Sequence, residues 1–134
     1  MAKLTEKHAR RFRDRNWGNV ATLRPDGTPH VTPVWVDTDG ENVLFNTAYG
    51  RAKVDYIRRD PRVAIEVHDE HDPQSAYVSV TGTAELVEEG ADEHIDKLAR
   101  KYLGEERYPY RKPGERRVIV KIHPELIDAY GKAA

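Results

Sequence analysis

Residues 17–36 read WGNVATLRPDGTPHVTPVWV, and this stretch determines the fold that we expect. Along residues 17–24 the side chains alternate with a period of two, which is typical of a strand. The turn Asp26-Gly27 comes next, and Asp-Gly between two β-rich runs is a strong hairpin signal. The sequence therefore predicts that residues 28–36 form the antiparallel neighbour of the first strand, with residues 20–24 paired to residues 28–32.

The second of these strands contains two prolines, Pro29 and Pro33. Proline has no backbone N–H and cannot donate to a sheet ladder, so it is confined to edge strands and bulges. We therefore expect this strand to lie at an edge or to be bulged. An edge strand also leaves backbone groups that a ligand can use.

The remaining pattern continues the antiparallel order. A second turn is expected at residues 37–40, a helix should end at the Asp60-Pro61 step, and Gly82 should mark a kink in a long strand. Six mostly sequential strands satisfy their edges most easily by closing into a barrel. The sequence predicts a mainly β, six-stranded antiparallel barrel with flanking helices; its other strands are 42–47, 62–67, 77–87 and 117–122, and its helices are 4–15, 51–60 and 91–103.

Composition narrows the class of protein. The chain has 134 residues, which suits a single domain over residues 1–134, and it contains no cysteine. Its 22 basic and 23 acidic residues argue against general nucleic-acid binding. No apolar run approaches the roughly 18 residues of a membrane span, and the N-terminus lacks a signal peptide pattern. We expect a cytoplasmic protein with a modest core, for which a dimer interface would add apolar burial.

One segment has the architecture of an anion site. Residues 46–53, NTAYGRAK, run from a strand end through a glycine turn into a helix start. Backbone N–H groups and the helix dipole favour an anion there, while Arg51 offers a planar fork and Lys53 a mobile charge. Arg58 and Arg59 add charge further along the helix. The alternative is that these are solvated charges on a surface helix.

Other chemistry finds little support in the sequence. His68 and His71 stand in an acidic loop, but their spacing matches no zinc motif, so no metal is expected. There is no Gly-x-Ser-x-Gly motif and no cysteine, which argues against a nucleophilic hydrolase. A bound cofactor supplies chemistry more easily here. Four aromatic residues either line a planar ligand or belong to the barrel core: Trp17, Trp35, Tyr49 and Tyr77.

Three runs, in their order and spacing, resemble a known family. They are residues 17–36, residues 51–63 (RAKVDYIRRDPRV) and residues 77–86 (YVSVTGTAEL). The chain from about residue 16 to residue 130 resembles the pyridoxamine 5′-phosphate oxidase-like split β-barrels. It is most similar to the branch, common in actinobacteria, that uses the deazaflavin coenzyme F420.

This resemblance implies a homodimer with a cofactor site in each groove between the subunits. It implies an F420-dependent oxidoreductase that transfers a hydride between the deazaflavin and a small conjugated, unsaturated organic acceptor. Two alternatives stay open, an FMN-binding oxidoreductase of the same fold and a non-catalytic F420 carrier. The chain lacks the C-terminal arginine-bearing segment of true pyridoxamine phosphate oxidases, and no residue stands out as a catalytic acid or base.

The resemblance also assigns roles to residues. Arg51 and Lys53 are expected to hold the cofactor phosphate, and Asn46 and Thr47 to supply polar contacts at the strand end. The full set of implied cofactor contacts is Thr32, Pro33, Val34, Asn46, Thr47, Arg51, Ala52, Lys53, Ala76 and Tyr77. Thr32 to Val34 are expected against the deazaflavin ring, and Ala76 and Tyr77 at the pocket wall.

Overall fold

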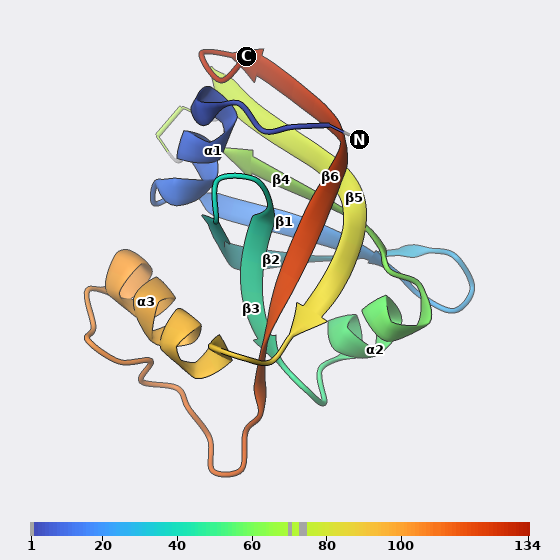
Figure 1. The fold of residues 1–134 in the computed structure, drawn as a ribbon, viewed down its shortest axis with the longest axis vertical. Coiled ribbons are helices and arrows are strands. Elements are labelled where there is room, and N and C mark those ends of the chain that lie inside the picture. The colour runs from blue at the N-terminus through green and yellow to red at the C-terminus, as the bar shows by residue number, and fades with distance from the viewer. Residues whose placement is uncertain (1, 70, 73–74) are drawn as a thin grey trace.

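A computed structural model describes residues 2–69, 71–72 and 75–134 of the chain. Within them, six antiparallel strands close into a barrel, and three helices lie outside it (Figure 1). The predicted mainly β barrel is therefore confirmed. Its elements are α1 (Glu6–Arg13), β1 (Trp17–Leu23), β2 (Pro29–Thr38), β3 (Val43–Ala48), α2 (Ala52–Arg59), β4 (Arg62–His68), β5 (Ala76–Val87), α3 (Ala91–Leu103) and β6 (Arg117–Gly131). Around the barrel the strand order is β1-β2-β3-β6-β5-β4.

The β1–β2 hairpin forms as the sequence predicts. Its register runs from Trp17 opposite Trp35 to Leu23 opposite Pro29. At the turn, Gly27 has a φ of 86°, in the region that favours glycine. The Asp26 carboxylate accepts hydrogen bonds from the backbone and the hydroxyl of Thr28, which closes the turn locally.

The proline-bearing strand β2 pairs with β1 over most of its length and with β3 only at its C-terminal end. It pairs with β1 along residues 29–35, whereas it pairs with β3 only from Val36 to Thr38. Pro29 and Pro33 lie four residues apart, so they face the same side of the strand, and the missing N–H groups fall on the open side. In the closed barrel β2 is therefore not an edge strand, but both prolines lie in the part of it that pairs on one side alone.

The turn expected at residues 37–40 begins two residues later. Asp37 and Thr38 continue β2 and are buried, with 3% and 8% of their surface exposed. Asp37 tolerates burial because its carboxylate accepts hydrogen bonds from His94 and Lys97, both far away in the chain. The turn itself is organised by Asp39, whose carboxylate accepts the backbone N–H groups of Glu41 and Asn42.

The last strand is longer than the predicted 117–122, because β6 continues through Pro124 to Gly131. It remains paired with β5, with a register shift between Thr81 and Gly82. A Cβ at Gly82 would lie 2.1 Å from the His123 carbonyl oxygen, so only glycine allows the two strands to approach there. A register shift thus lies beside Gly82, where the sequence predicts a kink, and the bulge accommodates Pro124 within the ladder.

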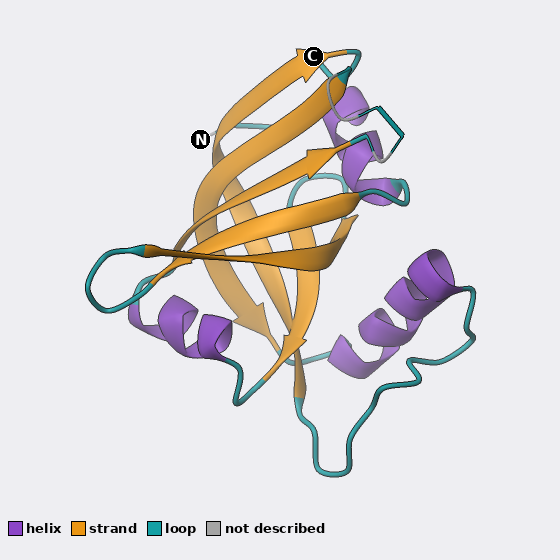
Figure 2. Cartoon of the chain, turned by 180° about the vertical axis from the view of Figure 1, so that it is seen from behind, coloured by secondary structure: helices purple, strands orange, loops and turns teal. Residues whose placement is uncertain are grey.

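The helices divide between the two ends of the barrel. Figure 2 shows α1 near one end and α2 and α3 near the other. Phe12 of α1 is fully buried and belongs to the barrel core with Val20, Phe45 and Ile65. The apolar face of α3 forms a second cluster, Ile95, Leu98 and Tyr102, against Trp35. Among the described residues, no helix is long and apolar enough to cross a membrane.

Candidate functional site

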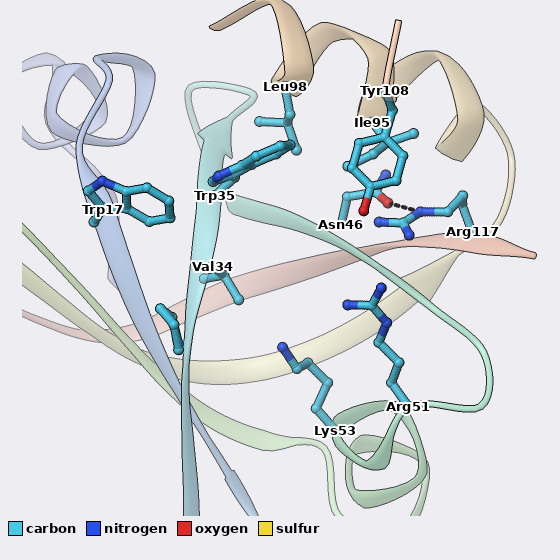
Figure 3. A pocket seen from close by; sticks show the side chains of 11 residues that line it. Trp17, Val34, Trp35, Asn46, Arg51, Lys53, Ile95, Leu98, Tyr108 and Arg117 are labelled. Atoms are coloured by element: carbon cyan, nitrogen blue, oxygen red, sulfur yellow. Dashed lines mark hydrogen bonds between the residues drawn. The ribbon is translucent and has the colours of Figure 1, made fainter. Parts of the chain in front are cut away.

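A pocket of about 140 Å³ opens beside β2, between the start of α2, the helix α3 and the segment that leads into β6 (Figure 3). Arg51 and Lys53 lie on one side of the pocket, and the aromatic side chains lie on the other side with Arg117. The lining residues are Trp17, Pro33, Val34, Trp35, Asn46, Arg51, Lys53, Ile95, Leu98, Tyr108 and Arg117. The pocket therefore joins residues from both ends of the chain.

Two cations stand at the start of α2. Gly50 turns the chain with a φ of 97°, and Arg51 occupies the N-cap position, where its side chain makes no capping hydrogen bond. Lys53 is half-buried, and this burial together with the positive charge of Arg51 lowers the pKa of Lys53. Among the described residues, no ion pair involves Arg51 or Lys53. A bound anion would relieve this unfavourable arrangement and use the open N–H groups of the helix.

A third cation, Arg117 of β6, faces the pocket and was missed by the sequence reasoning. It is only 6% exposed, and its Nε donates to Asn46 Oδ1 at 2.9 Å. Its Nη1 forms an ion pair with Glu115, and its guanidinium lies 5.0 Å from the centre of the Tyr108 ring. The only sequence signal was a charged residue at the start of a β-branched run, which is common at strand ends.

The aromatic wall is built by contacts between rings. Trp35 stacks on Tyr102 with 5.3 Å between centroids, and Tyr108 meets Trp35 edge-on at 6.0 Å. The ring centroids of Trp17 and Tyr102 lie 5.7 Å apart, and 43% of the Trp17 surface is exposed. Of the four aromatic candidates from the sequence, Trp17 and Trp35 therefore line the pocket.

The other two aromatic candidates lie elsewhere. Tyr49 packs between Arg58 and Arg116, whose guanidinium carbons lie 4.8 and 4.7 Å from its ring centre. Tyr77 stacks on Tyr130 at 5.7 Å on the outside of the β5–β6 pair.

The structure brings together half of the predicted cofactor contacts. Pro33, Val34, Asn46, Arg51 and Lys53 line one pocket. These five residues come from β2, β3 and the start of α2, so the pairing of β2 with β3 and the short connection from β3 to α2 bring them into one place.

The other predicted contacts do not line this pocket. The hydroxyl groups of Thr32 and Thr47 are buried and have no hydrogen-bond partner among the described residues, and Ala52 is exposed at the first position of α2. Ala76 is fully buried in the barrel core, and Tyr77 lies in the stack described above.

The additional charges that the sequence suggested are engaged elsewhere. Arg58 packs on Tyr49, and Arg59 donates to the backbone carbonyl groups of Arg24 and Pro25. His68 is paired with Glu66 at 2.8 Å, and no group of metal-ligating side chains occurs among the described residues. Glu70, part of the acidic loop, lies outside the described residues.

Comparison with known proteins places this geometry in context. The family model for pyridoxamine 5′-phosphate oxidase matches residues 4–131. A solved F420 reductase is 30% identical, with a TM-score of 0.78, over 93% of this chain and 98% of the other. A conserved hypothetical protein from Mycobacterium tuberculosis is 28% identical, with a TM-score of 0.72, over 96% of this chain and 86% of the other.

A more distant structure has the same fold. A pyridoxamine 5′-phosphate oxidase-related, FMN-binding protein from Nostoc punctiforme is 17% identical, with a TM-score of 0.60, over 84% of this chain and 73% of the other. Among curated proteins, no match to the sequence was found.

Proposed function

Because the chain belongs to the pyridoxamine 5′-phosphate oxidase family, we propose that it is an oxidoreductase that uses coenzyme F420. It transfers a hydride between the deazaflavin and a small conjugated, unsaturated organic acceptor. The observation that carries this proposal is the pair Arg51 and Lys53, two cations without an ion pair among the described residues, at an uncapped helix start beside an aromatic wall. The likeness to the F420 reductase favours the deazaflavin.

The donor set of the pocket fits the cofactor. F420 carries a phosphodiester, and Arg51 and Lys53 would hold it with the first N–H groups of α2. Pro33 and Val34 would lie against the ring, at the open side of β2 where the strand has backbone groups without a neighbour. Trp17 and Trp35 would cover the apolar side of the site.

The chain's own contribution to the reaction is positioning. When bound, F420 supplies the hydride chemistry, so the protein need not provide a nucleophile or a metal. The cations fix the anionic end at one side of the pocket, and the aromatic side chains exclude water from the other. Holding cofactor and acceptor in a productive geometry is itself a large part of catalysis.

The site on one chain is too small for the whole cofactor, and this supports a homodimer. Pockets that hold drug-sized ligands measure at least about 300 Å³, whereas this pocket measures about 140 Å³. Trp17 at its rim is 43% exposed, and Tyr77, Tyr130 and Leu126 expose a further apolar surface. A second copy would complete the groove and bury apolar surface at the same time.

Two measurements test the proposal. The purified protein should quench or shift the fluorescence of F420 on titration, and it should bind FMN more weakly. With reduced F420 it should then reduce members of a panel of conjugated, unsaturated acceptors. Tighter binding of FMN would mean that the pocket is a flavin site, because FMN also ends in a phosphate that Arg51 and Lys53 can hold.

One observation favours a second candidate, a non-catalytic F420 carrier. Among the described residues, the side chains that line the pocket include no carboxylate and no histidine, and the only side chains there that could act as a general acid or base are Lys53, which is assigned to the phosphate, and Tyr108. A carrier needs the binding groups alone. Tight F420 binding without turnover of any acceptor would favour the carrier, whereas turnover would exclude it.

A further inference from the structure

Four buried or half-buried polar side chains form a chain of hydrogen bonds that ends at the pocket. They come from four elements: Asp37 of β2, His94 of α3, Asn46 of β3 and Arg117 of β6. Asp37, His94 and Arg117 are 3%, 7% and 6% exposed. Burying such groups is costly unless each is satisfied, so their arrangement is constrained at every link. We call these four residues the relay.

The first link fixes the tautomer of His94. Its Nε2 lies 3.0 Å from Asp37 Oδ2, which also accepts a hydrogen bond from Lys97 at 3.0 Å. Burial alone would raise the pKa of Asp37, but these hydrogen bonds lower it to about 2. The ionised carboxylate only accepts hydrogen bonds, so His94 carries a proton on Nε2, and in the neutral ring Nδ1 is an acceptor.

The second link fixes the side-chain amide of Asn46. Its Nδ2 lies 3.1 Å from His94 Nδ1 and 2.9 Å from the Ala91 carbonyl oxygen, so both hydrogens are used. Its Oδ1 consequently points the other way and accepts from Arg117 Nε at 2.9 Å. The opposite orientation would place Oδ1 against two acceptors and the amide hydrogens against a donor. Asn46 therefore lines the pocket with its amide engaged by the protein.

The third link presents Arg117 to the pocket. Asn46 holds Nε, Glu115 holds Nη1 and the Tyr108 ring supports the guanidinium face. Figure 3 shows the guanidinium groups of Arg117 and Arg51 turned toward one another across the pocket. Glu115 brings one negative charge close to three cations, with an ion pair to Arg117 and a weaker electrostatic interaction with Arg51, so the pocket keeps an excess of positive charge.

We propose that Arg117 is a third ligand for the anionic end of the cofactor, and that His94 is a positioning residue that holds it there through Asn46. This inference rests on the proposed function and deepens it. Arg117 contacts the ligand directly, whereas Asp37, His94 and Asn46 act through it. The relay thereby connects α3 to the anion site at the start of α2.

Affinity measurements on matched variants test the proposal. Arg117→Met should weaken F420 binding by about ten- to a hundredfold, as expected for loss of a charge-assisted hydrogen bond. His94→Leu should weaken it by roughly tenfold, a usual effect of removing a residue that orients a ligand. His94→Gln should keep most of the wild-type affinity for F420, since the glutamine amide can donate to Asp37 and accept from Asn46. The phosphate-free deazaflavin core of F420 should bind all variants equally.

A double-mutant cycle separates positioning from a general structural role. If His94 acts through Arg117, His94→Leu should cost less than about twofold in the Arg117→Met background. Equal losses in both backgrounds, with folded proteins, would overturn the proposal. A suitable control is His123→Leu, because His123 also pairs with a carboxylate, Glu85 at 2.8 Å, but does not line this pocket. It should leave the F420 affinity unchanged.

The tautomer provides a readout that needs neither cofactor nor variant. Nitrogen-15 NMR of the histidine rings should show His94 protonated at Nε2 in the free protein. Protonation at Nδ1 alone would overturn the relay, even if His94→Leu fails to fold. If the wild type binds neither F420 nor FMN, the proposed function fails, and with it the role of Arg117. If it binds but the His94 variants bind equally well, the relay alone fails.

Discussion

Burial of Lys53 and the nearby positive charge of Arg51 together lower the pKa of Lys53, and both side chains line the same pocket. Two like charges held at one helix start are unfavourable without a counterion. Within the described residues neither cation belongs to an ion pair. The pair therefore identifies the position at which an anionic group gains most from binding.

Arg51→Ala and Lys53→Ala should each weaken the binding of F420 by about ten- to a hundredfold. Each variant removes a charge-assisted hydrogen bond to the phosphate, which contributes roughly 1.5 to 3 kcal/mol. Both residues lie at the surface end of α2, so the fold should persist. Fluorescence titration gives the dissociation constants, and thermal melts report folding.

Arg58→Ala is the matched control for these two variants. Arg58 lies on the same helix, but it packs on Tyr49 and does not line the pocket. The affinity of this variant for F420 should stay within about twofold of the wild type, because Arg58 makes no contact in the pocket and salt screens the charge of an exposed side chain. Should Arg51→Ala and Lys53→Ala bind as tightly as this control, the basic loop is a solvated surface.

The affinity for F420 should fall at alkaline pH, with an onset below the ordinary lysine pKa of about 10.4. The phosphate binds the protonated form of Lys53, and burial with the Arg51 charge lowers the pKa of Lys53 in the free protein. Affinity is therefore constant below that pKa and declines above it. Dissociation constants measured from pH 7 to 10 should show this decline in the wild type and not in Lys53→Ala. If the affinity of Lys53→Ala also declines with pH, another titrating group causes the decline.

Gly82→Ala should destabilise the protein by about 1 to 3 kcal/mol, the usual cost of overpacking a well-packed site. The added methyl group would lie 2.1 Å from the His123 carbonyl oxygen, a backbone atom that cannot rotate away. Urea unfolding measures the loss. Thr81→Ala, an exposed neighbour on β5, should change the stability far less. An unaltered unfolding midpoint for Gly82→Ala would mean that the bulge at Gly82 relaxes easily.

The features that local sequence determines were predictable. The β1–β2 hairpin follows from a period of two and an Asp-Gly turn, and the open side of β2 follows from two prolines. Asp37 was expected in a turn because aspartate is common there. Its actual place in β2 depends on His94, which lies 57 residues away and gives no local signal. The extension of β6 was missed because a proline, here Pro124, normally ends a strand.

The pocket residues likewise fall into those that the local sequence predicts and those that it does not. Arg51 and Lys53 were predicted because the glycine turn and the helix start lie beside them in the sequence. Arg117 and Tyr108 reach the pocket from the other end of the chain, through closure of the barrel between β3 and β6. No spacing in the sequence reports that closure. Thr32, Thr47, Ala52, Ala76 and Tyr77 remain predictions as cofactor contacts, since they do not line the pocket of a single chain.

The protein should be a dimer at micromolar concentration. The reasons are the small volume of the pocket on one chain and the exposed apolar surface around Tyr77 and Tyr130. Light scattering should give twice the mass of the chain, and titration should give one F420 per chain. A monomer that still binds F420 tightly would show that one chain holds the complete site.

Asp37 should make the fold sensitive to acid. Burial by itself would raise the pKa of this carboxyl, but hydrogen bonds from His94 and Lys97 lower it to about 2. The pKa in the unfolded chain is about 3.9, so the stabilisation is fully present above roughly pH 4 and is lost as the pH falls toward 2.

This charge-dependent stabilisation by Asp37 amounts to about 2 to 3 kcal/mol at neutral pH. Asp37→Asn should therefore lower the free energy of unfolding at pH 7, and its difference from the wild type should shrink as the pH falls from about 4 to 2. Urea unfolding at several pH values measures this difference, with the exposed Asp128→Asn as the control. If the difference between Asp37→Asn and the wild type stays constant down to pH 2, the Asp37 carboxylate does not stabilise the fold through its charge.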